Sequence, residues 1–237
     1  MWCTKEYGDM RIYIQTRCTA TTVGTTMLGR RLALDMDKCR LSLIFFERNE
    51  QQRVFHDAYL KTCAQLLDMA PETVTQELLI QAQPQAGKST SIAMFAAAMV
   101  SACPDVRLVV YTKSRNDSLQ MLNKVVHYTC LIRSTCKPNL LSLSGEEACF
   151  EGGGIVTSVP TKATTTKGMD SDIIIIDDAA LTDPSFFYET ICPTWQMGGK
   201  CIICISTPTT DVNFYSRLCT MKDFNLLCVP TQAMATV

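Results

Sequence analysis

Residues 173–180 read IIIIDDAA, four β-branched side chains followed by two carboxylates. Four isoleucines in a row leave no polar face, which is typical of a strand buried on both sides in a parallel sheet. The two acids then stand at the carboxyl end of that strand, the edge where such sheets bind ligands. Adjacent acids also cap helices, so their meaning depends on what else reaches this edge.

Other short aliphatic runs alternate with segments of helical spacing. Such alternation indicates parallel strands that are covered by helices on both faces. We therefore predict an α/β fold of three layers with a mainly parallel central sheet. The expected strands are residues 78–80, 108–111, 155–159, 173–176 and 201–205, and the expected helices are 52–69, 88–101 and 117–130.

Length and composition narrow the class of protein. The 237 residues suit one or two domains, and 47% apolar residues give ample material for a core. A balance of 22 basic and 23 acidic residues excludes a uniformly basic nucleic-acid binder, although not a local basic groove. No apolar run approaches the length of a membrane span, and the charged start is unlike a signal peptide, so we expect an intracellular protein without a membrane partner. We divide the chain into a lead-in region, 1–70, and an α/β domain, 71–237.

The 13 cysteines are interpreted as reduced core residues, because their number is odd and many lie in apolar runs. Cys201 and Cys204 have the spacing of a metal or redox pair. On a strand, however, positions three apart face opposite sides, so their sulfurs would diverge. We expect no zinc site here.

The segment AQPQAGKST, residues 82–90, lies between an expected strand and an expected helix, as a phosphate-binding loop does. N–H groups at a helix N-terminus bind phosphate, and Gly87 would let the backbone approach it. Lys88 would contact the β and γ phosphates of ATP, and Ser89 would offer its hydroxyl to Mg²⁺. Gly-Lys-Ser also recurs by chance, and Ala82 replaces the usual first glycine, so the context carries this interpretation. The predicted phosphate-binding residues are Gln85, Ala86, Gly87, Lys88, Ser89 and Thr90.

The two acids would complete this site. Asp177 would hold Mg²⁺, directly or through water, and Asp178 would orient and deprotonate the attacking water. The next expected strand ends in Ser206 and Thr207, which could sense the γ-phosphate and couple hydrolysis to movement. A polar strand end is ordinary by itself, but here it would meet the other two motifs at one edge of the sheet.

With these motifs placed, residues 78–229 resemble the ATPase domain of viral large terminase subunits, the motors that package double-stranded DNA into preformed capsids. The resemblance consists of a Walker A loop without its first glycine, a Walker B strand ending in acids, and a Ser-Thr-Pro motif followed by Phe214-Tyr215. The glycine turn at 152–154 and the stretch 166–170 also match. Herpesvirus-type terminases are favoured over tailed-phage enzymes.

The resemblance implies a P-loop ATPase that uses ATP and Mg²⁺, with Lys88 and Asp178 as catalytic residues, Ser89 and Asp177 at the metal, and Ser206 and Thr207 in coupling. It also implies double-stranded DNA, a homo-oligomeric ring, a capsid portal and a small terminase subunit as partners. A herpesvirus-type enzyme would work in the host nucleus.

Three features depart from the family pattern. Pro84 stands where the loop usually carries an arginine, so Arg115, Arg133 or a neighbouring subunit would have to supply that cation. The catalytic acid is usually Glu, and Asp178 is one methylene shorter. A nuclease domain normally follows, but no cluster of metal-binding acids comes after the ATPase motifs, so we expect no nuclease activity from this polypeptide.

A packaging motor holds the DNA backbone through basic side chains rather than reading bases. The candidates near the ligand edge are Lys113, Arg115, Lys162 and Lys167, each of which could equally be a solvated surface residue. Two other functions stay open. A helicase-type or other P-loop translocase would need a second motor domain, and a catalytically inactive packaging or scaffold subunit would explain Pro84 and Asp178.

Overall fold

The computed structural model describes residues 2–7, 10–15, 35–68, 76–103, 105–132, 138–161, 170–197, 201–208, 213–220 and 225–229. The chain divides into two compact units, Met1–Arg31 and Leu32–Val237. The first contains an antiparallel hairpin of β1 (Trp2–Tyr7) and β2 (Met10–Gln15).

This division lies well before the boundary expected at residue 70. The reason is that α1 (Met36–Leu43) and α2 (Glu50–Asp68) belong to the second unit, where both helices contact α3 (Lys88–Ala102). Phe55, Tyr59 and Cys63 of α2 are fully buried in the same core as the residues of α3.

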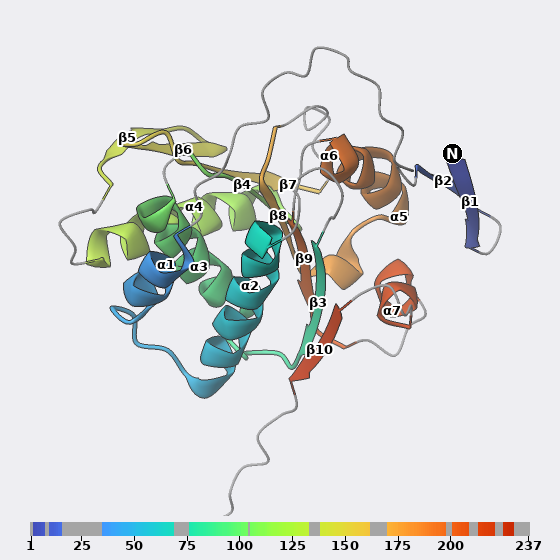
Figure 1. Ribbon diagram of the computed structural model, residues 1–237, viewed down its shortest axis with the longest axis horizontal. Coiled ribbons are helices and arrows are strands. Elements are labelled where there is room, and N and C mark those ends of the chain that lie inside the picture. Colours follow the sequence, from blue (N-terminus) through green and yellow to red (C-terminus); the bar gives the residue numbers. More distant parts are fainter. Residues whose placement is uncertain are drawn as a thin grey trace, which may run out of the picture. The chain divides into compact units, whose positions relative to one another are not determined.

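An eight-stranded sheet forms the centre of the described part of the second unit, in the order β10-β3-β9-β8-β4-β7-β6-β5 (Figure 1). The six strands from β10 to β7 are parallel, and β6 and β5 continue the sheet in antiparallel pairing. The strands are β3 (Gln76–Ala82), β4 (Arg107–Thr112), β5 (Leu140–Leu143), β6 (Glu147–Phe150), β7 (Ile155–Pro160), β8 (Ile173–Asp177), β9 (Cys201–Ser206) and β10 (Asn225–Val229).

Helices cover both faces of this sheet, which gives three layers. On one face, α1 to α3 and α4 (Arg115–Leu131) share a core with alternate strand residues such as Ile173 and Ile175. On the other face, Ile174 and Ile176 pack with residues of the helical segments that follow β8 and β9. Those segments are η1 (Ala179–Leu181), α5 (Pro184–Phe186), η2 (Phe187–Ile191), α6 (Cys192–Met197) and α7 (Phe214–Cys219).

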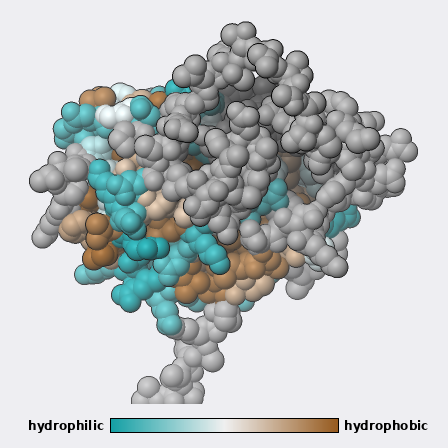
Figure 2. Space-filling view, in the orientation of Figure 1, coloured by the Kyte–Doolittle hydropathy of each residue, from teal (hydrophilic) through white to brown (hydrophobic). Residues whose placement is uncertain are grey.

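The predicted α/β fold with a mainly parallel sheet is confirmed, and each expected strand and helix lies within two residues of an observed element. Cys201 and Cys204 belong to the cores on opposite faces of the sheet, as the strand geometry predicts. Among the described helices, none combines the length and apolar character that crossing a bilayer requires. Figure 2 shows hydrophobic surface around the edge strand β10, where Leu226 is exposed.

Candidate nucleotide-binding site

The loop between β3 and α3 has the backbone shape of a phosphate-binding loop. Gln85 and Gly87 both have left-handed conformations, with φ of 64° and 79°. Gly87 is the N-cap of α3 and brings no capping side chain, and its carbonyl accepts from Ser91 N–H at 2.8 Å. The first turn of a 15-residue helix therefore presents its N–H groups and the positive end of its dipole at this loop.

Lys88, the first residue of α3, turns its ammonium group back along the loop. Its Nζ donates to the carbonyl oxygens of Ala82 and Gln83 at 3.3 and 3.0 Å, and to Thr207 Oγ1 at 2.9 Å. The side chain is buried, which lowers the pKa of Lys88, while Asp178 and Asp177 act in the opposite direction. Lys88, which is predicted to contact phosphate, thus donates a hydrogen bond to Thr207, one of the two predicted coupling residues.

The two acids follow β8 as expected and face different surroundings. Asp177 is buried with 7% of its surface exposed, whereas Asp178 is half-buried. Burial raises the pKa of Asp177 to about 6, although a hydrogen bond from Ser89 favours the charged form. Asp177 also accepts from the backbone N–H of Asp178 at 3.1 Å. Asp178 itself has a left-handed backbone, which an aspartate tolerates better than most residues.

Ser206 joins the end of β9 to the turn that follows β8. Its hydroxyl accepts from Ala180 N–H at 3.1 Å, and Ser206 is buried. Since Thr207 accepts from Lys88, these two neighbours contact the Walker A lysine on one side and the Walker B turn on the other. The three predicted motifs therefore meet at one edge of the sheet.

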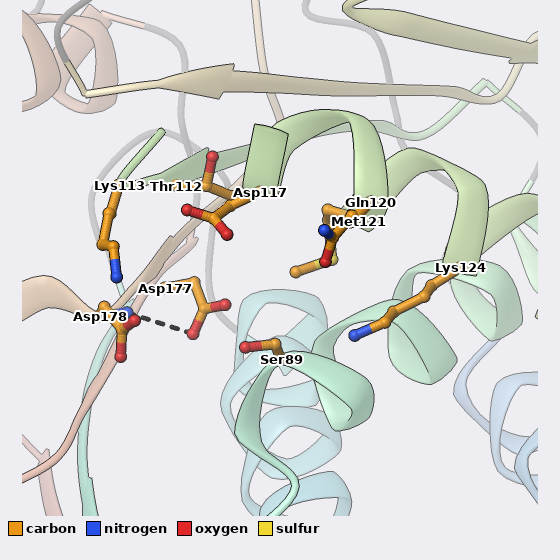
Figure 3. Close-up of a pocket in the computed structure, with 9 residues that line it drawn as sticks. All are labelled: Ser89, Thr112, Lys113, Asp117, Gln120, Met121, Lys124, Asp177 and Asp178. Atoms are coloured by element: carbon orange, nitrogen blue, oxygen red, sulfur yellow. Dashed lines mark hydrogen bonds between the residues drawn. The ribbon is translucent and has the colours of Figure 1, made fainter. Parts of the chain in front are cut away.

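An open pocket of about 410 Å³, counting the space at its mouth, lies beside this junction. Ser89, Asp177 and Asp178 form one wall, and the end of β4 and one face of α4 form the other (Figure 3). Its lining residues are Ser89, Thr112, Lys113, Asp117, Gln120, Met121, Lys124, Asp177 and Asp178.

Comparison with known proteins adds evidence on the fold. No protein-family model matches the sequence, and no curated protein does. Among solved structures, the large terminase ATPase domain of Thermus Phage P74-26 matches with a TM-score of 0.61 and 16% identity, over 79% of this chain and 83% of that one. The large terminase of the HK97 bacteriophage matches with a TM-score of 0.58 and 15% identity, over 84% of this chain and 45% of that one. The chain has the fold of a large terminase ATPase domain.

The HK97 terminase chain in that structure is about twice as long as the region shared with it, since the match covers 45% of it. Another matching large terminase, from a thermophilic bacteriophage, was solved in complex with ADP. That structure has a TM-score of 0.55 and 12% identity, over 76% of this chain and 44% of that one. At such identities the similarity establishes the common fold.

The terminase fold here includes a contact that the sequence did not suggest. At the start of α2, Asn49 and Gln52 cap the helix by reciprocal side chain to backbone bonds of 3.1 and 2.7 Å. The Gln52 amide then donates to Gly87 O at 3.4 Å, and His56, one turn further, bonds Ser91 O at 3.0 Å. Burial lowers the pKa of His56 to about 4, so the imidazole is neutral at neutral pH. The Asn-x-x-Gln capping pattern at 49–52 was the only available signal.

The oxygen donors of this terminase fold suit Mg²⁺. A hydroxyl from Ser89 and a carboxylate from Asp177 are hard ligands, and Mg²⁺ in phosphate sites takes only one or two protein ligands besides water and phosphate. Across the described residues, no group of three or more His, Cys, Asp or Glu side chains could hold a metal ion without such help. Asp177 and Ser89, already bonded to each other, would hold the ion.

The remaining candidates are separated from these motifs in different ways. Lys113 and Arg115 are exposed, but only Lys113 lines the pocket. Lys162, Lys167 and Arg133 lie outside the described residues. Thr90 is half-buried on α3, Ala86 is buried, and Pro84, where the resemblance led us to expect an arginine, is exposed.

Proposed function

We propose that the chain is the Mg²⁺-dependent ATPase motor of a viral terminase, which couples ATP hydrolysis to translocation of double-stranded DNA into a preformed capsid. The observation that carries the proposal is the bond between Lys88 Nζ and Thr207 Oγ1, together with that between Ser206 and the turn after Asp177 and Asp178. The terminase fold supports the proposal, because it brings all three motifs together at a single edge of the sheet.

In the proposed reaction, water attacks the γ-phosphorus atom while the bond to the β–γ bridging oxygen breaks, leaving ADP and phosphate. Asp178 accepts the proton that the attacking water loses. Lys88 leaves its backbone acceptors to contact the phosphates, and Ser89 and Asp177 hold Mg²⁺. Mg²⁺, when bound, neutralises charge on the phosphate oxygens.

The assembly around this reaction is proposed from the resemblance. A homo-oligomeric ring would hold the DNA backbone through basic residues, of which Lys113, Arg115, Lys162 and Lys167 are candidates. The capsid portal and a small terminase subunit would be its protein partners. A herpesvirus-type origin, action in the host nucleus and the lack of nuclease activity in this polypeptide stay predictions.

The test is ATP hydrolysis by the purified chain with Mg²⁺ or with EDTA, in the presence and absence of linear double-stranded DNA. We expect turnover that requires Mg²⁺, rises with DNA and is lost in Lys88→Ala. Turnover that is equal with and without DNA would support an ATPase and contradict a packaging motor.

The second candidate function is an inactive packaging or scaffold subunit. The exposed Pro84 in place of an arginine and the short Asp178 side chain favour it. This alternative would be established if the wild-type chain binds nucleotide without hydrolysing it and the Lys88→Ala variant no longer binds nucleotide.

A further inference from the structure

Two lysines outside the Walker motifs line the pocket. Lys113 and Lys124 share it with three carboxylates, Asp117, Asp177 and Asp178. A divalent cation at Asp177 would leave the pocket with an excess of positive charge. Such a pocket suits an anionic group bound next to the metal ion, as the terminal phosphate of ATP is.

The strand register brings Lys113 to the acids. β4 and β8 are paired in parallel up to Tyr111 and Ile176, so the residues that follow each strand leave the sheet at the same edge. Lys113 is two residues past this last pair on β4, and Asp178 is two residues past it on β8. Figure 3 shows the Lys113 side chain pointing toward Asp178.

The ammonium group of Lys88 lies elsewhere. It is bonded to the end of β3 and to Thr207 after β9, on the opposite side of the acids from β4, because the sheet order is β3-β9-β8-β4. Residue 84, where the resemblance leads us to expect a second cation, is proline. A γ-phosphate between Ser89 and Asp178 would therefore meet Lys113 on its β4 side.

We propose that Lys113 is a catalytic residue that contacts the γ-phosphate of ATP and supplies the positive charge that Pro84 cannot. This proposal rests on the proposed function, since it names a further residue of the same site. Lys113 forms no covalent bond; its ammonium donates hydrogen bonds to phosphate oxygens and stabilises the charge that they carry during transfer. Lys124 lines the other end of the pocket, on α4 (Figure 3).

The test compares two nucleotides on the full chain, ADP and ATP-γ-S, each with Mg²⁺, by equilibrium titration. We expect Lys113→Ala to weaken binding of ATP-γ-S at least tenfold and to leave ADP binding within twofold, because only ATP-γ-S has a terminal phosphate for a charge-assisted bond. Lys113→Arg keeps the charge and should recover most of the loss. Lys61→Ala, at an exposed lysine of α2 away from the pocket, is the matched control and should change neither.

Other outcomes overturn the proposal. Equal loss for both nucleotides would make Lys113 a general contributor to the site, and an ATP-γ-S-specific loss in Lys124→Ala instead would assign the contact to that residue. Lys113 is exposed, so its replacement should not prevent folding, and an unchanged thermal midpoint checks this. A wild-type chain that binds neither nucleotide would overturn the proposed function, and this proposal with it.

Discussion

At the scale of single residues, Asp178, the proposed proton acceptor, has an unusual backbone conformation. Its φ of 54° and ψ of 44° are left-handed, a conformation that Asp and Asn adopt more readily than most residues. Asn at this position keeps the shape and the backbone but cannot accept a proton. Asp178→Asn should therefore lower kcat by about 10²-fold or more and leave nucleotide affinity and thermal midpoint almost unchanged. Steady-state kinetics and nucleotide titration measure the two effects.

Asp178→Gly is the companion variant, since glycine also accepts this backbone and removes the carboxylate altogether. It should lose activity as Asn does. If Asp178→Asn keeps more than half of the wild-type rate, the proton acceptor is another group and the role given to Asp178 is wrong.

At the scale of elements, the end of β9 connects two of the motifs, and Thr207 is its contact with Lys88. Thr207→Val keeps the volume of the side chain and removes the acceptor, whereas Thr207→Ser keeps the hydroxyl. We expect Val to reduce the stimulation of hydrolysis by DNA about tenfold, while nucleotide affinity stays within threefold, because a hydrogen bond to a charged group contributes about 1.5–3 kcal/mol. Ser should resemble the wild type. If DNA stimulates ATP hydrolysis equally in all three proteins, Thr207 does not couple hydrolysis to DNA.

The junction between α2 and the phosphate loop gives a second test on this scale. A Cβ on Gly87 would lie 2.5 Å from Gln52 Nε2, and the φ of 79° strains any other residue. Gly87→Ala should cost about 1–3 kcal/mol of unfolding free energy. Combined with Gln52→Ala, the cost should be smaller than the sum of the two single costs, because the clash is removed.

Urea unfolding of the four proteins measures this coupling. Gly145→Ala is the control, because a Cβ there meets nothing within 4 Å, and it should stay within about 0.5 kcal/mol of the wild type. Additive costs for Gly87→Ala and Gln52→Ala would contradict the contact.

Burial decides which of the elements can be predicted from the sequence. Strands such as β8 and β9, buried along their whole length, are runs of apolar residues that end in a single polar one. β5 was missed because its four residues are exposed at the sheet edge, where burial imposes no pattern. The Walker motifs could be predicted because each lies within a few residues of a strand end. The contact of Gln52 with Gly87 could not, since it depends on how α2 packs against a loop that is distant in the chain.

At the scale of the whole molecule, two buried groups shape the dependence of stability on pH. The pKa of Asp177 is raised from 3.8 to about 6 in the folded state, so the free energy of unfolding falls as pH rises through this range. The pKa of His56 is lowered from 6.5 to about 4 in the folded state, so the free energy of unfolding falls as pH falls through that range. Each effect amounts to about 3 kcal/mol, and in the wild type the two largely offset each other between pH 4 and 6.5.

Asp177→Asn removes one of these effects and exposes the other. In EDTA at pH 8, where Asp177 is charged and buried without a metal ion, the variant should be more stable than the wild type by about 3 kcal/mol. At pH 4 most of the difference should be gone, because Asp177 is then protonated in the folded state and close to half-protonated in the unfolded state. The stability of the variant should fall between pH 6.5 and 4, as His56 takes up a proton on unfolding.

Urea unfolding at pH 4, 6 and 8 measures the difference, with Asp57→Asn on the exposed surface of α2 as the control. A difference that does not change with pH would mean that the Asp177 carboxylate is not held at a raised pKa. Added Mg²⁺ and ATP-γ-S should then favour the wild type over the variant, since only the wild type keeps the carboxylate that holds the metal ion.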